Sequence, residues 1–398
     1  MEVRFLASAG AAALRSRYGD ALAPDAAAEL SAAADARVLV ANGGMPAAVC
    51  ALLRDAGAVV ASAGAVILIA ASRAAIERAR VLANGGAEAA SVDALLRAFE
   101  RAASVAPVLR VRERVLDLRG EARVMGIVNV TPDSFYERVG GADAAVAKAR
   151  TMVADGAAIV DVGGQSYAAG NGHVMPEEEA ARVVPAVRAI AECGLEAAIS
   201  VDTYTASVAD AALTAGAHIV NDCSGLSDAA LPEVVAKHGA ALVVMHVKGK
   251  LRVREPETYV YRDALAEIVE FLYECTERAV AGGVARDAIA VDPGLEFGKE
   301  PHTDLEILAR FGELRALGYP IVLAASRKSF IGRTMGLPPN DLLVPSLAAA
   351  AAGIAAGARI VRAHDVAETV LLARMLAAVE RPGAAEDERQ LATRSGGS

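Results

Sequence analysis

Short apolar runs rich in β-branched residues recur along the chain from residue 123 onward, and longer stretches with helical periodicity separate them. The runs are Val124–Val130, Ala158–Val162, Ala198–Val201, His218–Val220, Ala241–Met245, Ala288–Val291, Ile321–Ala325 and Arg359–Val361. Such near-continuous hydrophobicity is typical of strands that are buried on both faces of a parallel sheet. Eight strand–helix units in about 250 residues predict an α/β fold, a TIM (β/α)8 barrel.

A doubly wound open sheet is the alternative fold for a chain with this alternation. It would be large with eight strands, and its first strand would be followed by a glycine-rich dinucleotide turn. No such turn follows the run Val124–Val130. The pattern therefore favours the barrel.

The first 117 residues differ in composition and pattern. They are rich in alanine and lack the regular alternation of strand and helix patterns. Helical patterns are present at 25–35, 46–55, 73–83 and 91–104, with short strands at Arg37–Ala41 and Val66–Ala70. They predict a small α/β N-terminal domain, for which a scaffold or dimerisation role is favoured over separate catalysis. The charged, alternating stretch Arg110–Gly120 predicts a hairpin or a linker that closes the bottom of the barrel.

Three segments follow from these patterns. They are an N-terminal α/β extension at 1–117, a barrel at 118–380, and a tail at 381–398 that has lost its apolar period and is predicted to be disordered.

Composition excludes several classes of partner. The net charge of −9 argues against nucleic acid, since a phosphate backbone needs a basic face. The apolar stretch Ala56–Ala71 is shorter than the roughly 20 residues that span a bilayer, and the first residues do not resemble a secretory signal. Four widely spaced cysteines without a CxxC motif predict reduced thiols in a cytoplasmic enzyme.

Polar residues stand at the end of every predicted strand. They are Asn129, Asp161, Asp202, Asn221, Asp222, His246, Asp292, Ser326, Arg327, Lys328, Ser329, Arg362, His364 and Asp365. Because the active site of a TIM barrel lies at the carboxyl ends of its strands, this set predicts one functional rim. Asp222 is expected to cap its turn, His246 and Asp365 to support neighbouring groups, and Asp161 either to bind ligand or to satisfy the barrel backbone.

The rim combines two kinds of chemistry. Carboxylates and amides, together with a lysine, can hydrogen-bond a flat heterocycle that has a donor edge and a carbonyl; these residues are Asp202, Asn221, Asp292 and Lys328. Arg362 and His364 can neutralise phosphate oxygens, and Asn129 offers a hard oxygen ligand to a divalent metal. The rim thus predicts a polar aromatic ring that carries a phosphorylated arm.

Eight segments in order resemble the signature blocks of the dihydropteroate synthase family, over about residues 121–375. They are MGIVNVTPDSF (125–135), DVGGQS (161–166), SVDTY (200–204), AGAHIVND (215–222), VVMHVKG (243–249), DPGLEFGK (292–299), SRKSFIGR (326–333) and GARIVRAHD (357–365). The resemblance implies a transferase of folate biosynthesis that joins a dihydropterin pyrophosphate to p-aminobenzoate. It also implies Mg²⁺ as cofactor and a possible homodimer.

The resemblance also assigns roles to residues. Asp202, Asn221, Asp292 and Lys328 would hold the pterin, with Met245 and Phe297 packed near it. Arg362 and His364 would bind the pyrophosphate, Asn129 its Mg²⁺, and Ser329, at a helix N-terminus, the p-aminobenzoate carboxylate. Thr131, Asp133 and Phe135 would form a mobile loop over the second substrate. The catalytic residues implied are Asp133, which would stabilise a pterin cation, Lys328, Arg362 and His364.

Two loops depart from the family pattern. Tyr167 and Ala168 stand where a Thr-Arg pair is usual, which removes a charge-assisted contact to pyrophosphate, and the stretch Lys250–Arg254 replaces a usual Pro and Met. Arg138 in the first loop is a hypothetical substitute for the missing arginine. A non-catalytic pterin-binding paralogue is therefore an open alternative. A pterin-dependent methyltransferase is another, although SRKSFIG argues against it.

Overall fold

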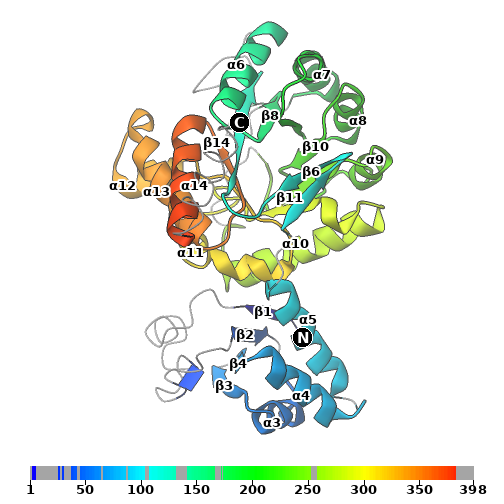
Figure 1. Ribbon diagram of the computed structural model, residues 1–398, viewed down its shortest axis with the longest axis vertical. Coiled ribbons are helices and arrows are strands. Elements are labelled where there is room, and N and C mark those ends of the chain that lie inside the picture. Colours follow the sequence, from blue (N-terminus) through cyan, green and yellow to red (C-terminus); the bar gives the residue numbers. More distant parts are fainter. Residues whose placement is uncertain are drawn as a thin grey trace, which may run out of the picture. The chain divides into compact units, whose positions relative to one another are not determined.

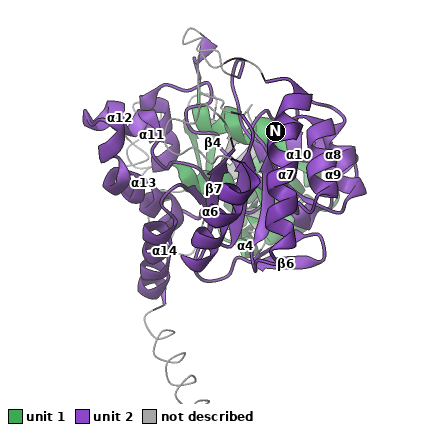
Figure 2. Ribbon diagram, turned by 90° about the horizontal axis from the view of Figure 1, so that it is seen from above, with its two compact units in different colours: residues 1–105, 262–273, 310–319 green, residues 106–261, 274–309, 320–398 purple. Residues whose placement is uncertain are grey.

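The computed structural model divides into two compact units, which we describe separately (Figure 2). Unit 1 comprises residues 1–105, 262–273 and 310–319, and unit 2 comprises residues 106–261, 274–309 and 320–398. The residues whose structure is described are 2–5, 26, 29–30, 37–42, 45–63, 66–86, 88–103, 107–130, 141–165, 172, 174–251 and 258–381. The predicted disordered tail thus lies outside the described residues, apart from Arg381. The boundary predicted at residue 117 stays a prediction.

Parallel strands form the centre of unit 2 (Figure 1). In chain order they are β7 (Arg123–Asn129), β8 (Ile159–Gly163), β9 (Ala198–Asp202), β10 (Ile219–Asp222), β11 (Ala241–Met245), β12 (Ile289–Asp292), β13 (Val322–Leu323) and β14 (Ile360–Ala363). Their spatial order is β12-β11-β10-β9-β8-β7-β14-β13, and a parallel bridge between Val291 and Ile321 joins the two ends. The predicted TIM barrel is confirmed, and each of the eight predicted runs overlaps a strand, although several strands extend one or two residues beyond the predicted end.

Helices follow the strands and cover the outside of the barrel (Figure 1). They are α6 (Ala142–Ala154), α7 (Pro176–Glu192), α8 (Ala206–Thr214), α9 (Leu231–Lys237), α10 (Ala264–Ala281), α11 (Pro301–Ala309), α12 (Ser329–Met335), α13 (Leu343–Ala355) and α14 (Val366–Glu380), with 3-10 turns η3 (Arg286–Ala288) and η5 (Pro339–Asp341). In α6 the buried residues Ala145, Ala149 and Met152 recur at helical spacing, so a narrow apolar stripe faces the strands. In α7 a proline occupies the first position and three glutamates the first turn, as the helix dipole favours.

A hairpin closes the amino-terminal end of the barrel. It consists of β5 (Val108–Val111) and β6 (Arg114–Asp117), which pair antiparallel. Leu109 and Val111 are buried in one cluster with residues from the beginnings of the barrel strands, such as Met125 and Ile159. The hairpin predicted at Arg110–Gly120 is therefore present, and it seals the face opposite to the strand ends.

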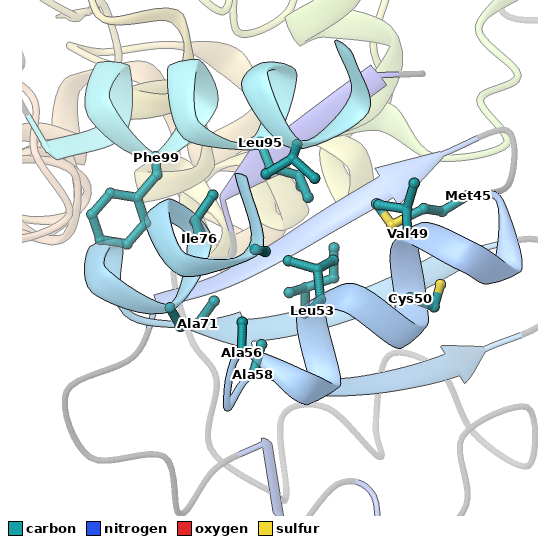
Figure 3. Packing of buried hydrophobic residues seen from close by; sticks show 14 residues of the cluster. Met45, Val49, Cys50, Leu53, Ala56, Ala58, Ala71, Ile76, Leu95 and Phe99 are labelled. Carbon is teal, nitrogen blue, oxygen red and sulfur yellow. The ribbon is translucent and has the colours of Figure 1, made fainter. Parts of the chain in front are cut away.

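Unit 1 contains an antiparallel sheet in the order β1-β2-β4-β3. Its elements are β1 (Glu2–Phe5), β2 (Arg37–Asn42), α3 (Ala47–Asp55), β3 (Val59–Ala63), β4 (Val66–Ala71), α4 (Arg73–Ala83) and α5 (Ala89–Ala103). Leu53 of α3, Ile76 of α4, and Leu95 and Phe99 of α5 pack in one apolar core (Figure 3). The helices predicted at 46–55, 73–83 and 91–104 are confirmed, whereas most of 25–35 lies outside the described residues.

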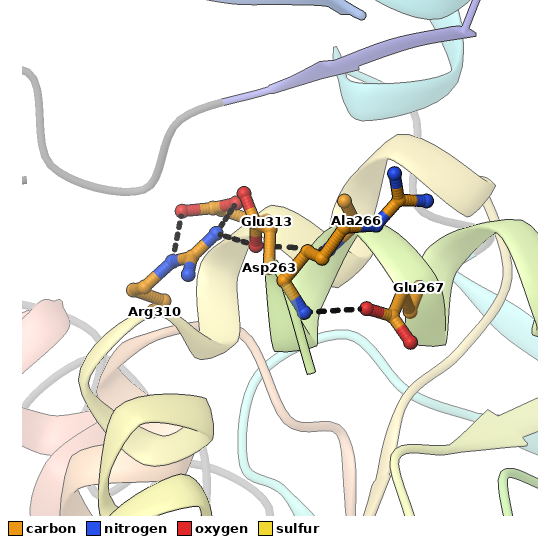
Figure 4. Close-up of polar contacts among 6 residues, drawn as sticks. Asp263, Ala266, Glu267, Arg310 and Glu313 are labelled. Atoms are coloured by element: carbon orange, nitrogen blue, oxygen red, sulfur yellow. Dashed lines mark hydrogen bonds and ion pairs between the residues drawn. The ribbon is translucent and has the colours of Figure 1, made fainter. Parts of the chain in front are cut away.

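A buried ion pair joins two segments of unit 1 that are distant in sequence. Arg310, which precedes the 3-10 helix η4 (Phe311–Leu317), donates to Glu313 at 2.9 Å and to Asp263 at 2.8 Å, while Asp263 also caps the backbone N–H of Ala266 (Figure 4). Glu313 is almost fully buried, so its charge requires this partner. Among the described residues of the whole chain, no helix combines the length and hydropathy of a membrane span.

Candidate functional site

An arginine links two buried carboxylates on neighbouring strands: Asp202 ends β9, whereas Asp161, which was predicted at the end of its strand, lies in the middle of β8. Arg362 of β14 donates from Nε to Oδ2 of Asp161 and from a terminal nitrogen to Oδ2 of Asp202, each at 2.7 Å. The side-chain amide of Asn221 donates to the same Asp161 oxygen at 3.1 Å. Because buried charges are tolerated only when they are paired, this network explains how three strands can each carry a buried polar side chain into the mouth of the barrel.

One oxygen of each of the two carboxylates takes no part in this hydrogen-bond network. Among the described residues, Oδ1 of Asp161 and Oδ1 of Asp202 are buried without a hydrogen-bond partner. Burial raises the pKa of Asp202 to about 7; Arg362 opposes this shift, and the nearby Asp161 adds to it. An unsatisfied buried acceptor costs free energy, so its presence indicates a ligand that brings an N–H or O–H donor.

Asn129 lies beside this network, across a glycine. It pairs with Gly163 in the sheet register, and Gly163 pairs with Asp202. A Cβ at Gly163 would lie 3.5 Å from Oδ1 of Asn129 and 3.7 Å from Oδ2 of Asp202. Glycine therefore keeps open the space onto which Asn129 and Asp202 converge.

Lys328 and Asp292 form a second part of the rim. Asp292, at the end of β12, accepts from the backbone N–H of Gly294 at 2.7 Å, and burial raises its pKa against the opposing effect of Lys328. Lys328 donates to the carbonyl of Leu295 at 2.5 Å, its Nζ lies 5.0 Å from the ring centre of Phe297, and burial lowers its pKa. Arg362 influences the pKa of both groups, so the two parts of the rim share one electrostatic environment.

Lys299 organises the loop after β12, although it is not among the residues predicted for the site. Its ammonium donates to the carbonyls of Gly294 and Phe297 and contacts Nδ1 of His246 at 2.9 Å. Burial lowers the pKa of Lys299 to about 7, and Asp304 opposes the shift. Burial also holds the pKa of His246 well below its usual value, so the imidazole is neutral and able to accept. The one sequence signal for Lys299 is a charged residue directly after a buried glycine turn.

Two glycines bring the loops after β11 and β12 into backbone contact. Gly294 and Gly298 have φ of 65° and 70°, which favours glycine. A Cβ on Gly294 would lie 1.9 Å from the carbonyl oxygen of His246, and one on Gly298 would lie 1.9 Å from that of Lys248. Neither position can hold a larger residue unless both loops move.

The helix after β13 begins at Ser329, and its first donors already have an acceptor. The hydroxyl of Ser329 donates to Oε1 of Glu296 at 2.7 Å, and the backbone N–H of Phe330 donates to the same oxygen at 2.5 Å. From the sequence, the hydroxyl of Ser329 and the N-terminus of its helix are expected to meet a substrate carboxylate. In the structure a carboxylate of the chain itself lies there.

His364 and its neighbour complete the rim at β14. Nδ1 of His364 lies 3.2 Å from Oγ of Ser326, and burial, followed by Arg362, lowers the pKa of the imidazole to about 4. Asp365 pairs with Arg327 at 2.7 Å, and Asp222 accepts from the N–H groups of Ser224 and Leu226, as expected for a turn cap. Met245 is buried at the end of β11. His364 is thus an uncharged hydrogen-bonding group near neutral pH.

The predicted residues therefore differ in how directly they meet. Arg362 bonds to Asp202 directly, Asn129 faces the same glycine as Asp202, and Asp292 and Lys328 interact electrostatically with Arg362. Asp161 bridges side chains rather than satisfying barrel backbone. The predictions for Thr131, Asp133, Phe135, Arg138, Tyr167 and Ala168 fall on residues outside the described part of the chain.

Comparison with known proteins agrees with this arrangement. Residues 125–364 match the family described as "Pterin binding enzyme". The dihydropteroate synthase of Bacillus subtilis (strain 168) is 39% identical over 279 residues, which cover 69% of this chain and 95% of that protein. The chain belongs to the dihydropteroate synthase family. An "Inactive dihydropteroate synthase 2" of Mycobacterium leprae is equally similar, with 40% identity over 265 residues, 65% of this chain and 90% of that one.

A solved dihydropteroate synthase shares the barrel. The structure from Xanthomonas albilineans with 4-aminobenzoic acid covers 69% of this chain and 98% of its own length, with 35% identity and a TM-score of 0.63. Family membership is therefore supported by sequence and by fold. Proteins named as synthases and a protein named as inactive are both among the similar relatives.

Proposed function

We propose that this chain is an active dihydropteroate synthase, a transferase that condenses 6-hydroxymethyl-7,8-dihydropterin pyrophosphate with p-aminobenzoate to give 7,8-dihydropteroate and pyrophosphate. The observation that carries the proposal is the open, buried oxygen of Asp202 beside Arg362. It matches a ligand with a donor edge next to an anionic arm. The names of the relatives from Bacillus subtilis and Xanthomonas albilineans support the same reaction.

The pterin would lie between the carboxylates and the loop after β12. Asp202 and Asp292 would accept N–H groups of the ring, Asn221 would hydrogen-bond its edge, and Lys328 would donate to a ring carbonyl or nitrogen. Met245 and Phe297 would pack on its faces. The burial of both carboxylates supports this role, because water competes poorly for their oxygens there.

The pyrophosphate would lie towards β14 and β7. Arg362 and His364 would hydrogen-bond its oxygens while the methylene C–O bond breaks, and the arylamine nitrogen would form the new C–N bond and release a proton. Asp133 would stabilise the cationic pterin, while Thr131 and Phe135 would cover the second substrate. Ser329 would contact the p-aminobenzoate carboxylate. Positioning and electrostatics would supply most of the rate enhancement.

Mg²⁺ fits this site as a metal shared between protein and substrate. Among the described residues no group of three or more His, Cys, Asp or Glu side chains could hold a metal ion by itself. Mg²⁺ commonly takes one or two protein oxygens and completes its shell with phosphate and water. The oxygen of Asn129, beside the space that Gly163 leaves open, suits that role. When bound, the ion would offset negative charge on the leaving group.

A second candidate is a pterin-binding protein without turnover. It is favoured by the Tyr167-Ala168 departure and by the similarity to the inactive relative from Mycobacterium leprae. Incubation of the purified protein with the dihydropterin pyrophosphate, Mg²⁺ and p-aminobenzoate separates the two. Pyrophosphate release that depends on p-aminobenzoate supports the synthase, whereas tight pterin binding without release supports the second candidate.

Location and assembly complete the proposal. Among the described residues Cys50, Cys193, Cys223 and Cys275 form no disulfide, which is compatible with the reducing cytoplasm. A homodimer is expected from the family resemblance, and a scaffold or dimerisation role is proposed for residues 1–117. Sedimentation of the full chain would measure its oligomeric state.

A further inference from the structure

The carboxylate of Glu296 occupies hydrogen-bond donors at the edge of the proposed pterin site. One of its oxygens, Oε1, accepts both from the hydroxyl of Ser329 and from the N–H of Phe330. Ser329 is exposed and Glu296 is half-buried, so these contacts lie where a ligand in the barrel mouth can reach them. Lys328, the residue before Ser329, interacts with Glu296 electrostatically.

The backbone holds Glu296 in an unusual conformation. Its φ is 71°, in the left-handed region that residues with a side chain rarely adopt. The N–H of Glu296 donates to Oδ1 of Asp304 at 2.9 Å, and the adjacent Leu295 carbonyl accepts from Lys328. Contacts on both sides therefore stabilise a turn that glycine would adopt more easily. The position carries a carboxylate at a cost in conformational free energy, which points to a role for that side chain.

The donors of Ser329 and Phe330 cannot serve two carboxylates at full strength. Charge-assisted hydrogen bonds are among the strongest polar contacts, and a second carboxylate nearby would be repelled by the first. In the proposed reaction the carboxylate of p-aminobenzoate is the second one. To bind there it must displace Glu296, or it must lie beside it.

We propose that Glu296 determines the specificity of the second-substrate site by competing internally with the carboxylate of p-aminobenzoate. The competition weakens binding of p-aminobenzoate and admits anilines whose para substituent is uncharged. This inference rests on the proposed function, and it adds the class of arylamine that the site accepts.

The test compares p-aminobenzoate with its neutral analogue 4-aminobenzamide in the wild type and in Glu296→Gly. Glycine suits the left-handed backbone, so this variant is expected to fold, and thermal unfolding would verify that. The KM for p-aminobenzoate is expected to fall by about tenfold, the share of one charge-assisted hydrogen bond. The KM for 4-aminobenzamide and kcat for either amine are expected to stay within about twofold, because neither depends on displacing a carboxylate.

Glu296→Gln and Glu300→Gln supply the controls. Glu296→Gln keeps the length of the side chain but removes its charge, so a smaller fall in the KM for p-aminobenzoate is expected. Glu300 lies four residues further along the same segment and pairs with Arg333 at 3.0 Å. Its change to Gln removes a carboxylate from the same region and is expected to leave both KM values unchanged. Equal KM values for p-aminobenzoate in the wild type and in Glu296→Gly overturn the inference.

A binding measurement keeps this outcome separate from the failure of the proposed function. If no variant releases pyrophosphate with either amine, the synthase proposal fails. Calorimetric titration of p-aminobenzoate into protein saturated with 6-hydroxymethylpterin, pyrophosphate and Mg²⁺ then decides the role of Glu296. Tighter binding to Glu296→Gly supports it, whereas equal binding, or undetectable binding to both proteins, overturns it.

Discussion

Two walls of the barrel mouth satisfy their polar groups in opposite ways. The strand wall, made of Asp161, Asp202, Asn221 and Arg362, leaves one oxygen of each carboxylate without a partner among the described residues. The loop wall, made of Glu296, Lys299, Lys328 and Ser329, bonds its ammonium groups to backbone carbonyls and its helix donors to its own carboxylate. The strand wall is therefore open to a ligand, whereas a ligand on the loop wall must exchange partners with the protein.

The largest expected effect comes from Asp202→Asn. This change removes the negative charge of the Asp202 carboxylate, and with it one of the two ion pairs of Arg362. We expect the Kd for 6-hydroxymethylpterin to rise by about 100-fold, as for loss of a buried charge-assisted hydrogen bond. Isothermal titration calorimetry measures it. Asp210→Asn is the matched control, because Asp210 is partly exposed, ends no barrel strand and pairs with Lys237 and His238. A change of less than about threefold in Asp202→Asn would place the pterin elsewhere.

The second-largest effect is expected on the free energy of unfolding, when Lys299 of the loop wall is replaced. Lys299→Met leaves two carbonyl oxygens and the His246 ring nitrogen without their donor, so the free energy of unfolding should fall by about 2 kcal/mol. Urea denaturation followed by circular dichroism measures it. Lys237→Met, which removes an exposed lysine that pairs with Asp210, should change it by less than about 0.5 kcal/mol. Equal losses in the two variants would show that Lys299 has no special part in the loop.

The smallest expected effect is a pH dependence of pterin affinity. Asp202 accepts a ligand N–H best when it is ionised, and its pKa in the free protein is about 7. Affinity should therefore be highest above pH 7 and fall below it by up to about tenfold per pH unit, as the carboxylate binds a proton that the ligand must displace. Titrations between pH 5.5 and 8.5 measure the curve. Asp202→Asn reports the ligand's own titration, and identical curves for both proteins would contradict the assignment.

The strand wall could be read from the sequence, because its residues lie in or at the ends of buried strands whose position follows from hydrophobic periodicity. Asp202 and Asn221 lie where a parallel strand must end, and barrel closure then brings those ends together. Even β13, whose ladder is two residues long, was predicted from its apolar run. The fold and half of the candidate site therefore follow from local pattern combined with a known architecture.

Two residues of the loop wall, Glu296 and Lys299, could not be predicted in the same way, although Lys328 and Ser329 were. Glu296 reaches Ser329 across 33 residues of sequence, through a left-handed turn that no periodicity marks. Lys299 acts by folding back onto its own loop, which depends on the contact between two backbones. In unit 1, none of the predicted strands corresponds to β1, which pairs with β2. Such features depend on tertiary contacts.

The close approach at Gly294 and Gly298 limits which changes of sequence the loops at the barrel mouth can accept. Each glycine is pressed against a carbonyl of the neighbouring loop, at His246 and at Lys248. Insertions or bulky replacements within either interlocked stretch would separate the two loops, so new specificities must come from side chains or from sequence beyond the contact. The departure of this chain at Lys250–Arg254 begins in the sequence two residues after Lys248, the last position of that contact, as this constraint requires.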